Sequence, residues 1–241
     1  MQAAAALAVA RAPVVRAPTG PACFGFGRRV ARAPRPVSGV RLTDGAAEAL
    51  AELLPLLLCG EESAVLAFGA RAARDSLDAA ACARLERIRR EEVVHGLLLQ
   101  RLQTALPAIV LEPSLRTRMR RFFIMLTDRD PGRYFARIAG LDSAVCIVLG
   151  ALRGRRSPLG GDAAVAATFA RIHRDEARHV DAARGIALAY APASRGLDAA
   201  VETRRHLVEL LRARGGAFER LGVDADELFG RLGTVSRGIF A

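Results

Sequence analysis

Hydrophobic residues recur along this chain at spacings of three and four, the period with which an α-helix turns one face toward a core. Alanine and leucine dominate, while Phe, Tyr and Trp together make up only 5% of the 241 residues. This balance favours helix over strand. The pattern therefore predicts an all-α protein.

Two of these apolar stripes are interrupted by the same pair of polar residues. Each has a Glu three positions before a His, so that carboxylate and imidazole project from one helical face. The motifs lie 84 residues apart, use two of the chain's four histidines and read Glu92-Val-Val-His95 and Glu176-Ala-Arg-His179. A buried carboxylate is costly unless it is paired or binds a metal ion. The motifs therefore predict either two structural His–Glu pairs or the two halves of a metal site.

Two further stripes also carry an acid where an apolar residue is expected. The first contains Leu54, Leu58, Glu62 and Val65, and the second contains Ile138, Asp142, Val145 and Leu149. Glu61 competes with Glu62, because apolar residues flank both. A predicted turn separates Glu62 from Glu92, and another separates Asp142 from Glu176. In each pair, the two acids are about equally far from the turn. The chain thus reads as a weak repeat of two helical hairpins, with a carboxylate on one helix facing a Glu-x-x-His on the other.

These six side chains define a candidate metal site, and four carboxylates with two imidazoles favour iron or manganese. Zinc prefers four-coordinate sites, and copper prefers sites rich in Cys or His. We expect two iron ions, with manganese as the second option. The predicted ligands are Glu62, Glu92, His95, Asp142, Glu176 and His179.

Composition divides the chain into three parts. Residues 1–42 are rich in Arg, Pro and Ala and predict a disordered tail, which could be a transit peptide or an artificial extension. Residues 43–191 predict a four-helix bundle, with a long crossover between its second and third helices that contains a basic helix of its own, about 115–127. Residues 192–241 predict a helical extension packed on the bundle or at the subunit contact of a homodimer. We find no run of 18 apolar residues and expect no membrane span.

Charge and cysteine content limit the cellular compartment and the binding partners that we expect. The net charge is +11, but the seven arginines among the first 41 residues leave the remainder at only +4. We therefore expect no specific nucleic-acid partner. The four cysteines are scattered without a C-x-x-C pair, which indicates a reducing compartment and a cytoplasmic protein. Cys59 and Cys146 are expected to be small apolar core residues.

The ligand pattern resembles the ferritin-like di-iron carboxylate superfamily over roughly residues 44–191 and implies a ferritin-like four-helix bundle. Within that superfamily, Asp175-Glu176-Ala-Arg-His179 is similar to the signature of the arylamine N-oxygenases, in a branch that also includes rubrerythrin-like proteins. The first motif departs from it, reading Glu91-Glu92-Val-Val-His95, and Asp142 stands where the family has Glu. The resemblance adds His173 as a seventh candidate ligand, although it is three residues before Glu176 rather than four. Asp175 and Arg178 are expected to orient ligands.

The resemblance implies an oxidase or oxygenase that uses dioxygen on a small-molecule substrate, with electrons from an external donor. Two alternatives stay open. One is a ferroxidase, a peroxidase or an iron-handling protein, and the other is a non-catalytic helical scaffold stabilised by metal.

Overall fold

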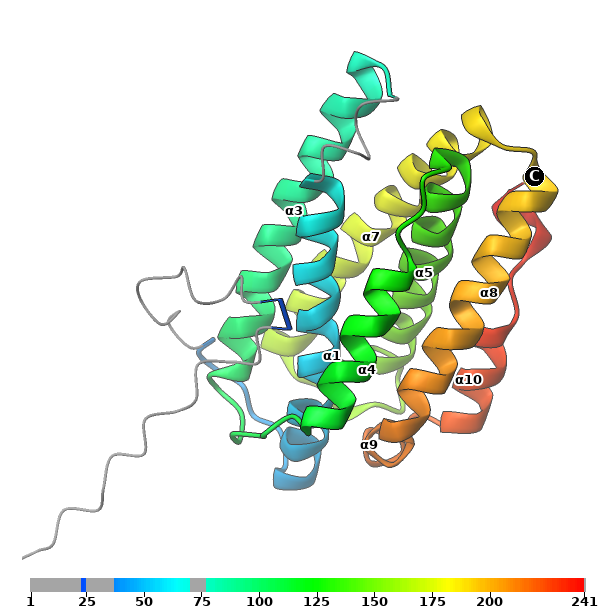
Figure 1. Cartoon of the computed structure of the whole chain (residues 1–241). Coiled ribbons are helices and arrows are strands. Elements are labelled where there is room, and N and C mark those ends of the chain that lie inside the picture. Colours follow the sequence, from blue (N-terminus) through cyan, green and yellow to red (C-terminus); the bar gives the residue numbers. More distant parts are fainter. Residues whose placement is uncertain (1–22, 25–36, 70–76, 241) are drawn as a thin grey trace, which may run out of the picture.

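The computed structural model describes residues 23–24, 37–69 and 77–240, and every regular element in these ranges is a helix (Figure 1). The all-α prediction is confirmed for this part of the chain. The remaining positions of the predicted tail and the turn at 70–76 lie outside the described residues.

Four long helices form two hairpins that position the site (Figure 1). Helix α1 (Asp44–Gly69) packs along α3 (Ala79–Gln103), and α5 (Pro131–Leu152) packs along α7 (Ala163–Tyr190). The two hairpins meet where α3 lies against α7. The side chain of Asp78 caps α3 by accepting a hydrogen bond from Ala81 N, and Asp162 caps α7 in the same way.

The connection between the hairpins contains α4 (Pro113–Met125), close to the basic helix that the sequence predicts. This helix lies across α1 and α8 (Ala193–Leu211) (Figure 1). Two arginines link α4 to α8 and α5. Arg118 donates to the carbonyl of Glu209 at 2.9 Å, and Arg137 donates to the carbonyl of Met125 at 3.0 Å. Helix α4 therefore covers the side of the bundle where α1 and α5 face each other.

The C-terminal segment packs mainly against the second hairpin, and its Gly215–Arg220 helix packs against α1. It comprises α8, α9 (Gly215–Arg220), α10 (Ala225–Gly233) and two short 3-10 turns, and the small α6 (Pro158–Gly161) precedes α7. Gly140 of α5 allows the close approach of α8, because a Cβ at that position would lie 2.8 Å from the Cα of Ala200. The buried Arg204 joins three segments by donating to the carbonyls of Gly140 and Thr234 and to the hydroxyl of Ser143.

By length and composition, helix α5 could cross a membrane, because its most apolar stretch of 18 residues has a mean hydropathy of 1.8. Core helices of soluble proteins pass the same test, and 56% of that stretch is buried within this protein. The helix lies between α7 and α8 and carries the buried acid Asp142 (Figure 1). These contacts are those of a core helix.

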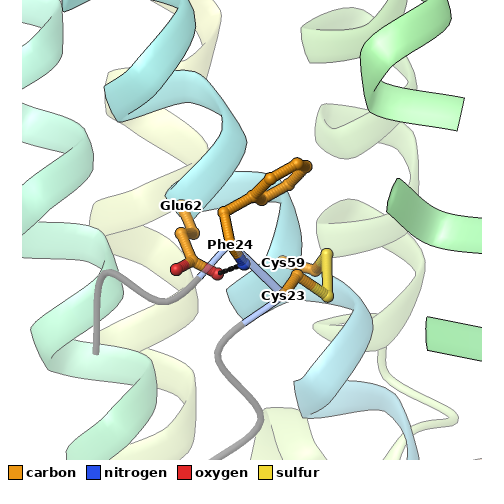
Figure 2. Close-up of a disulfide and its surroundings, with 4 residues drawn as sticks. All are labelled: Cys23, Phe24, Cys59 and Glu62. Atoms are coloured by element: carbon orange, nitrogen blue, oxygen red, sulfur yellow. Dashed lines mark hydrogen bonds between the residues drawn. A yellow bond between two sulfur atoms is a disulfide. The ribbon is translucent and has the colours of Figure 1, made fainter. Parts of the chain in front are cut away.

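Two described residues of the predicted tail, Cys23 and Phe24, pack on α1. Cys23 is buried and forms a disulfide with Cys59, and the backbone N–H of Phe24 donates to the Glu62 carboxylate at 2.8 Å (Figure 2). The guanidinium of Arg120 in α4 lies over the Phe24 ring. The expectation that Cys59 is a lone core thiol was therefore wrong. A disulfide is unusual in a reducing cytoplasm, and the cytoplasmic location stays a prediction.

Candidate metal centre

The two Glu-x-x-His motifs face each other where α3 packs against α7. Their four side chains are almost fully buried, with at most 4% exposed: Glu92, His95, Glu176 and His179. A stripe of apolar residues surrounds each motif, as the sequence predicts, so helical phase carries the polar side chains into the core.

Each glutamate presents one oxygen to each histidine. The Glu92 oxygens lie 3.3 Å from Nδ1 of His95 and 3.1 Å from Nδ1 of His179. The Glu176 oxygens lie 3.4 Å and 3.7 Å from the same two nitrogens. The imidazole centroids are 5.7 Å apart. The two carboxylates thus span the space between two nitrogen donors, as bridging ligands do.

The carboxylate that α1 contributes is Glu61. It is buried, and one of its oxygens lies 3.5 Å from Nδ1 of His95. Ligand atoms of Glu61, Glu92, His95 and Glu176 all lie within 4.8 Å of one another, and this group could hold a metal ion. Glu62 points about 100° away around the helix and binds the N–H of Phe24 instead (Figure 2). The structure therefore places the competing residue Glu61 in the cluster and the expected ligand Glu62 outside it.

Asp142 of α5 reaches the other side of the cluster. It is buried, it lines the same cavity as Glu92 and Glu176, and its Oδ2 has no hydrogen-bond partner among the described residues. Burial and the charges of Glu176 and Glu92 raise the pKa of Asp142 well above its usual range.

His173 lies outside the group of converging ligand atoms that includes Glu176, as do His179 and Asp142. Its side chain is half-buried. His173 and His179 lie three residues to either side of Glu176, which places them about 120° apart around α7. His179 points toward α3, so His173 is rotated out of the cluster.

The acid that precedes each ligand glutamate braces the histidine of the opposite helix. Asp175 of α7 lies 3.0 Å from Nε2 of His95, and Glu91 of α3 lies 2.8 Å from Nε2 of His179. Arg178 donates to both braces, at 2.8 Å to Asp175 and 3.2 Å to Glu91. Such outer carboxylates fix the tautomer of a histidine and turn its other nitrogen toward a metal.

The sequence analysis assigned an orienting role to Asp175 and Arg178 but overlooked Glu91. A signal was present, because an acid stands directly before the ligand glutamate in both motifs, as Glu91-Glu92 and Asp175-Glu176.

The close packing of acids and imidazoles shifts their proton affinities. Burial and the Glu92 charge raise the pKa of Glu61 well above its usual range. Burial alone would lower the pKa of His179, but the neighbouring carboxylates of Glu176 and Glu92 outweigh it and raise the pKa to about 11. The same balance raises the pKa of His95. Without metal, the cluster therefore retains protons at neutral pH. A bound metal ion would displace these protons.

The donor set also leaves polar atoms without a well-formed hydrogen bond. Nδ1 of His95 and Nδ1 of His179 lie 3.1–3.7 Å from carboxylate oxygens but form no hydrogen bond with described residues, and neither does the buried Oδ2 of Asp142. Each unsatisfied buried polar atom costs about 1–3 kcal/mol. A closed network of mutually satisfied Glu and His would leave no such atoms. The residues present thus fit a metal site better than a structural hydrogen-bond network.

A largely apolar cavity reaches the cluster from the gap between α1 and α5. Its empty volume is about 950 Å³ including the open mouth, and Glu61, Glu92, Asp142 and Glu176 lie in its wall. Helices α4 and α8 contribute the side chains that cover it. Tyr134, which the sequence analysis gave no role, also lines this cavity.

Comparison of the chain with protein-family models, with curated proteins and with solved structures finds no significant match. The description of the site therefore rests on the residues of this chain.

Proposed function

We propose that this chain is a dinuclear metal protein of the ferritin-like di-iron carboxylate type that activates dioxygen to oxidise a small molecule. One observation carries the dinuclear assignment: Glu92 and Glu176 each direct one oxygen to His95 and the other to His179. A single ion needs only one set of carboxylate and imidazole donors. Two carboxylates that each reach two imidazoles provide two such sets. Glu61 would complete the first pocket and Asp142 the second.

The donor set supports iron as the metal. Four carboxylates with two imidazoles are hard to borderline ligands, which suit iron and manganese, and their four negative charges balance two divalent ions. A neutral centre of this kind can lie in an apolar core without a large desolvation cost. When bound, two ferrous ions would supply electrons for the reduction of dioxygen.

The residues around the ligands would hold the two histidines in position and exclude water from the metal site. Asp175 and Glu91 accept hydrogen bonds from Nε2–H of the two histidines, so that each Nδ1 lone pair faces the centre. The apolar wall of the cavity keeps bulk water from most of the site. This cavity favours oxidation of an organic molecule over iron storage, because iron storage requires no apolar chamber at the ligands.

The overall reaction must balance electrons. Insertion of one atom of dioxygen into a substrate C–H bond gives a hydroxyl group, and the second atom leaves as water. That reduction takes two electrons and two protons, which an external donor supplies. The separate donor is the one that the resemblance implies.

Anaerobic titration with ferrous iron, followed by admission of dioxygen, tests the proposal. We expect two irons per chain and rapid oxygen uptake that requires bound iron. The Glu92→Ala, Glu176→Ala double variant should lose both, while Glu62→Gln, one residue from the ligand Glu61, should retain both. Iron binding near zero, or binding unchanged in the double variant, would contradict the dinuclear site. Slow accumulation of ferric iron with no rapid uptake would favour the iron-handling alternative.

A further inference from the structure

The cavity beside the cluster has a composition that restricts what can enter it. Most of its wall is aliphatic or aromatic, and α1, α4, α5 and α8 all contribute. Representative lining residues are Leu57, Ala64, Phe123, Leu141, Val145 and Leu211. The enclosed volume is about 100 Å³, and the space widens to about 950 Å³ when the open mouth is counted.

The charged side chains in the wall are all acidic. The four carboxylates of the cluster lie at one end, and the other polar side chains are Ser63, Thr127 and Tyr134. No arginine, lysine or histidine is among the described residues that line the cavity. Arg118 and Arg137 do not line the cavity, and they donate to the backbone carbonyls of Glu209 and Met125.

This wall disfavours a charged ligand. A carboxylate or phosphate buried here would lose its hydration without gaining a cationic partner. The centre itself would offer no compensation, because four carboxylates balance the charge of two divalent ions. A cationic ligand would likewise find these carboxylates committed to the metals. Apolar surface, by contrast, gains from leaving water in such a chamber.

We propose that the cavity binds a neutral, apolar organic molecule, one end of which lies against the carboxylate cluster and is oxidised there. This substrate class rests on the proposed function, since oxidation requires the metal centre. The binding step depends only on the cavity and can be measured separately. Size selection would come from the side chains that line the cavity, among them Ala64 of α1 and Val145 of α5.

The test uses the full chain and the neutral fluorescent probe N-phenyl-1-naphthylamine, whose emission rises in apolar surroundings. We expect one probe per chain, displaced by 1-decanol at a concentration at least tenfold lower than by decanoate, which has the same chain length and a negative charge. Ala64→Phe should fill the cavity and weaken probe binding at least tenfold. Ala80→Phe, the same change at an exposed position of α3, should have no effect.

Val145→Phe serves as a second filling variant if Ala64→Phe does not fold. Displacement by decanoate as good as by decanol, or full probe binding in a folded filling variant, would overturn the inference. Iron counts on the same samples separate the two proposals. Probe binding with no iron binding would contradict the proposed function alone, and two irons with no probe binding would contradict the substrate class alone.

Discussion

Removal of either outer carboxylate, Asp175 or Glu91, should weaken metal binding, and each removal should affect mainly one of the two ions. Asp175→Ala deletes the hydrogen bond to Nε2 of His95, and Glu91→Ala deletes the one to Nε2 of His179. Neither brace is among the converging ligand atoms, so the ligand count is unchanged. Each imidazole, however, would be free to change tautomer and rotate.

The expected loss follows from the kind of contact that is removed. Outer-shell partners of ligating histidines typically contribute 10- to 100-fold to metal affinity, about 1.4 to 2.7 kcal/mol. The two braces are only 15% and 26% exposed, so water replaces them poorly. Because they act on different histidines, Asp175→Ala should weaken mainly the ion near His95, and Glu91→Ala mainly the ion near His179. Shared contacts with Arg178 should make the two effects less than additive.

Anaerobic competition with a chelator, resolved into two binding steps, measures these affinities. Glu86→Ala is the matched control, since Glu86 also lies on α3 but pairs with Arg89. Gln at position 91 should restore part of the affinity, because its amide oxygen can still accept from Nε2–H. Losses below threefold for both brace variants, or losses equal to that of Glu86→Ala, would refute the bracing role.

Three further outcomes test the fold and the protonation of the site. Cys23→Ser should lower the free energy of unfolding by about 3–4 kcal/mol, because the Cys23–Cys59 disulfide, with a sequence separation of 36, restricts the unfolded chain; urea unfolding with no change would contradict this. Gly140→Ala should destabilise by about 1–3 kcal/mol through collision with α8, whereas Gly150→Ala on the same helix, with open space around it, should not. Metal binding at neutral pH should release protons and strengthen as pH rises. The pKa of His179 is raised to about 11, so this ligand stays protonated until the metal displaces the proton. Calorimetry in buffers of different ionisation enthalpy measures the release, and no release would contradict the reasoning.

The sequence predicts most of the cluster because helical phase is readable from apolar spacing. Glu92, His95, Glu176 and His179 each occupy a position where a core residue is expected, and all four are buried together. The choice between Glu61 and Glu62 could not be made that way. Both acids have apolar neighbours at helical spacing, and the difference between them arises from the rotation of α1 against α3.

Other features depend on contacts that no local pattern encodes. The Cys23–Cys59 disulfide joins α1 to a segment whose Arg and Pro content predicts disorder. The cavity exists because α1 and α5 stand apart while α4 and α8 cover the gap, which follows from the packing of four helices. The bracing role of Glu91 requires the register of α3 against α7. Each depends on tertiary arrangement.

Native mass spectrometry of the chain loaded anaerobically with ferrous iron tests the dinuclear centre most directly. The geometry predicts a dominant species with two irons, which is reduced to one or none when Glu92 and Glu176 are both replaced by alanine. A chain that binds a single iron at saturation, or that binds two irons equally well without Glu92 and Glu176, would contradict the bridging arrangement.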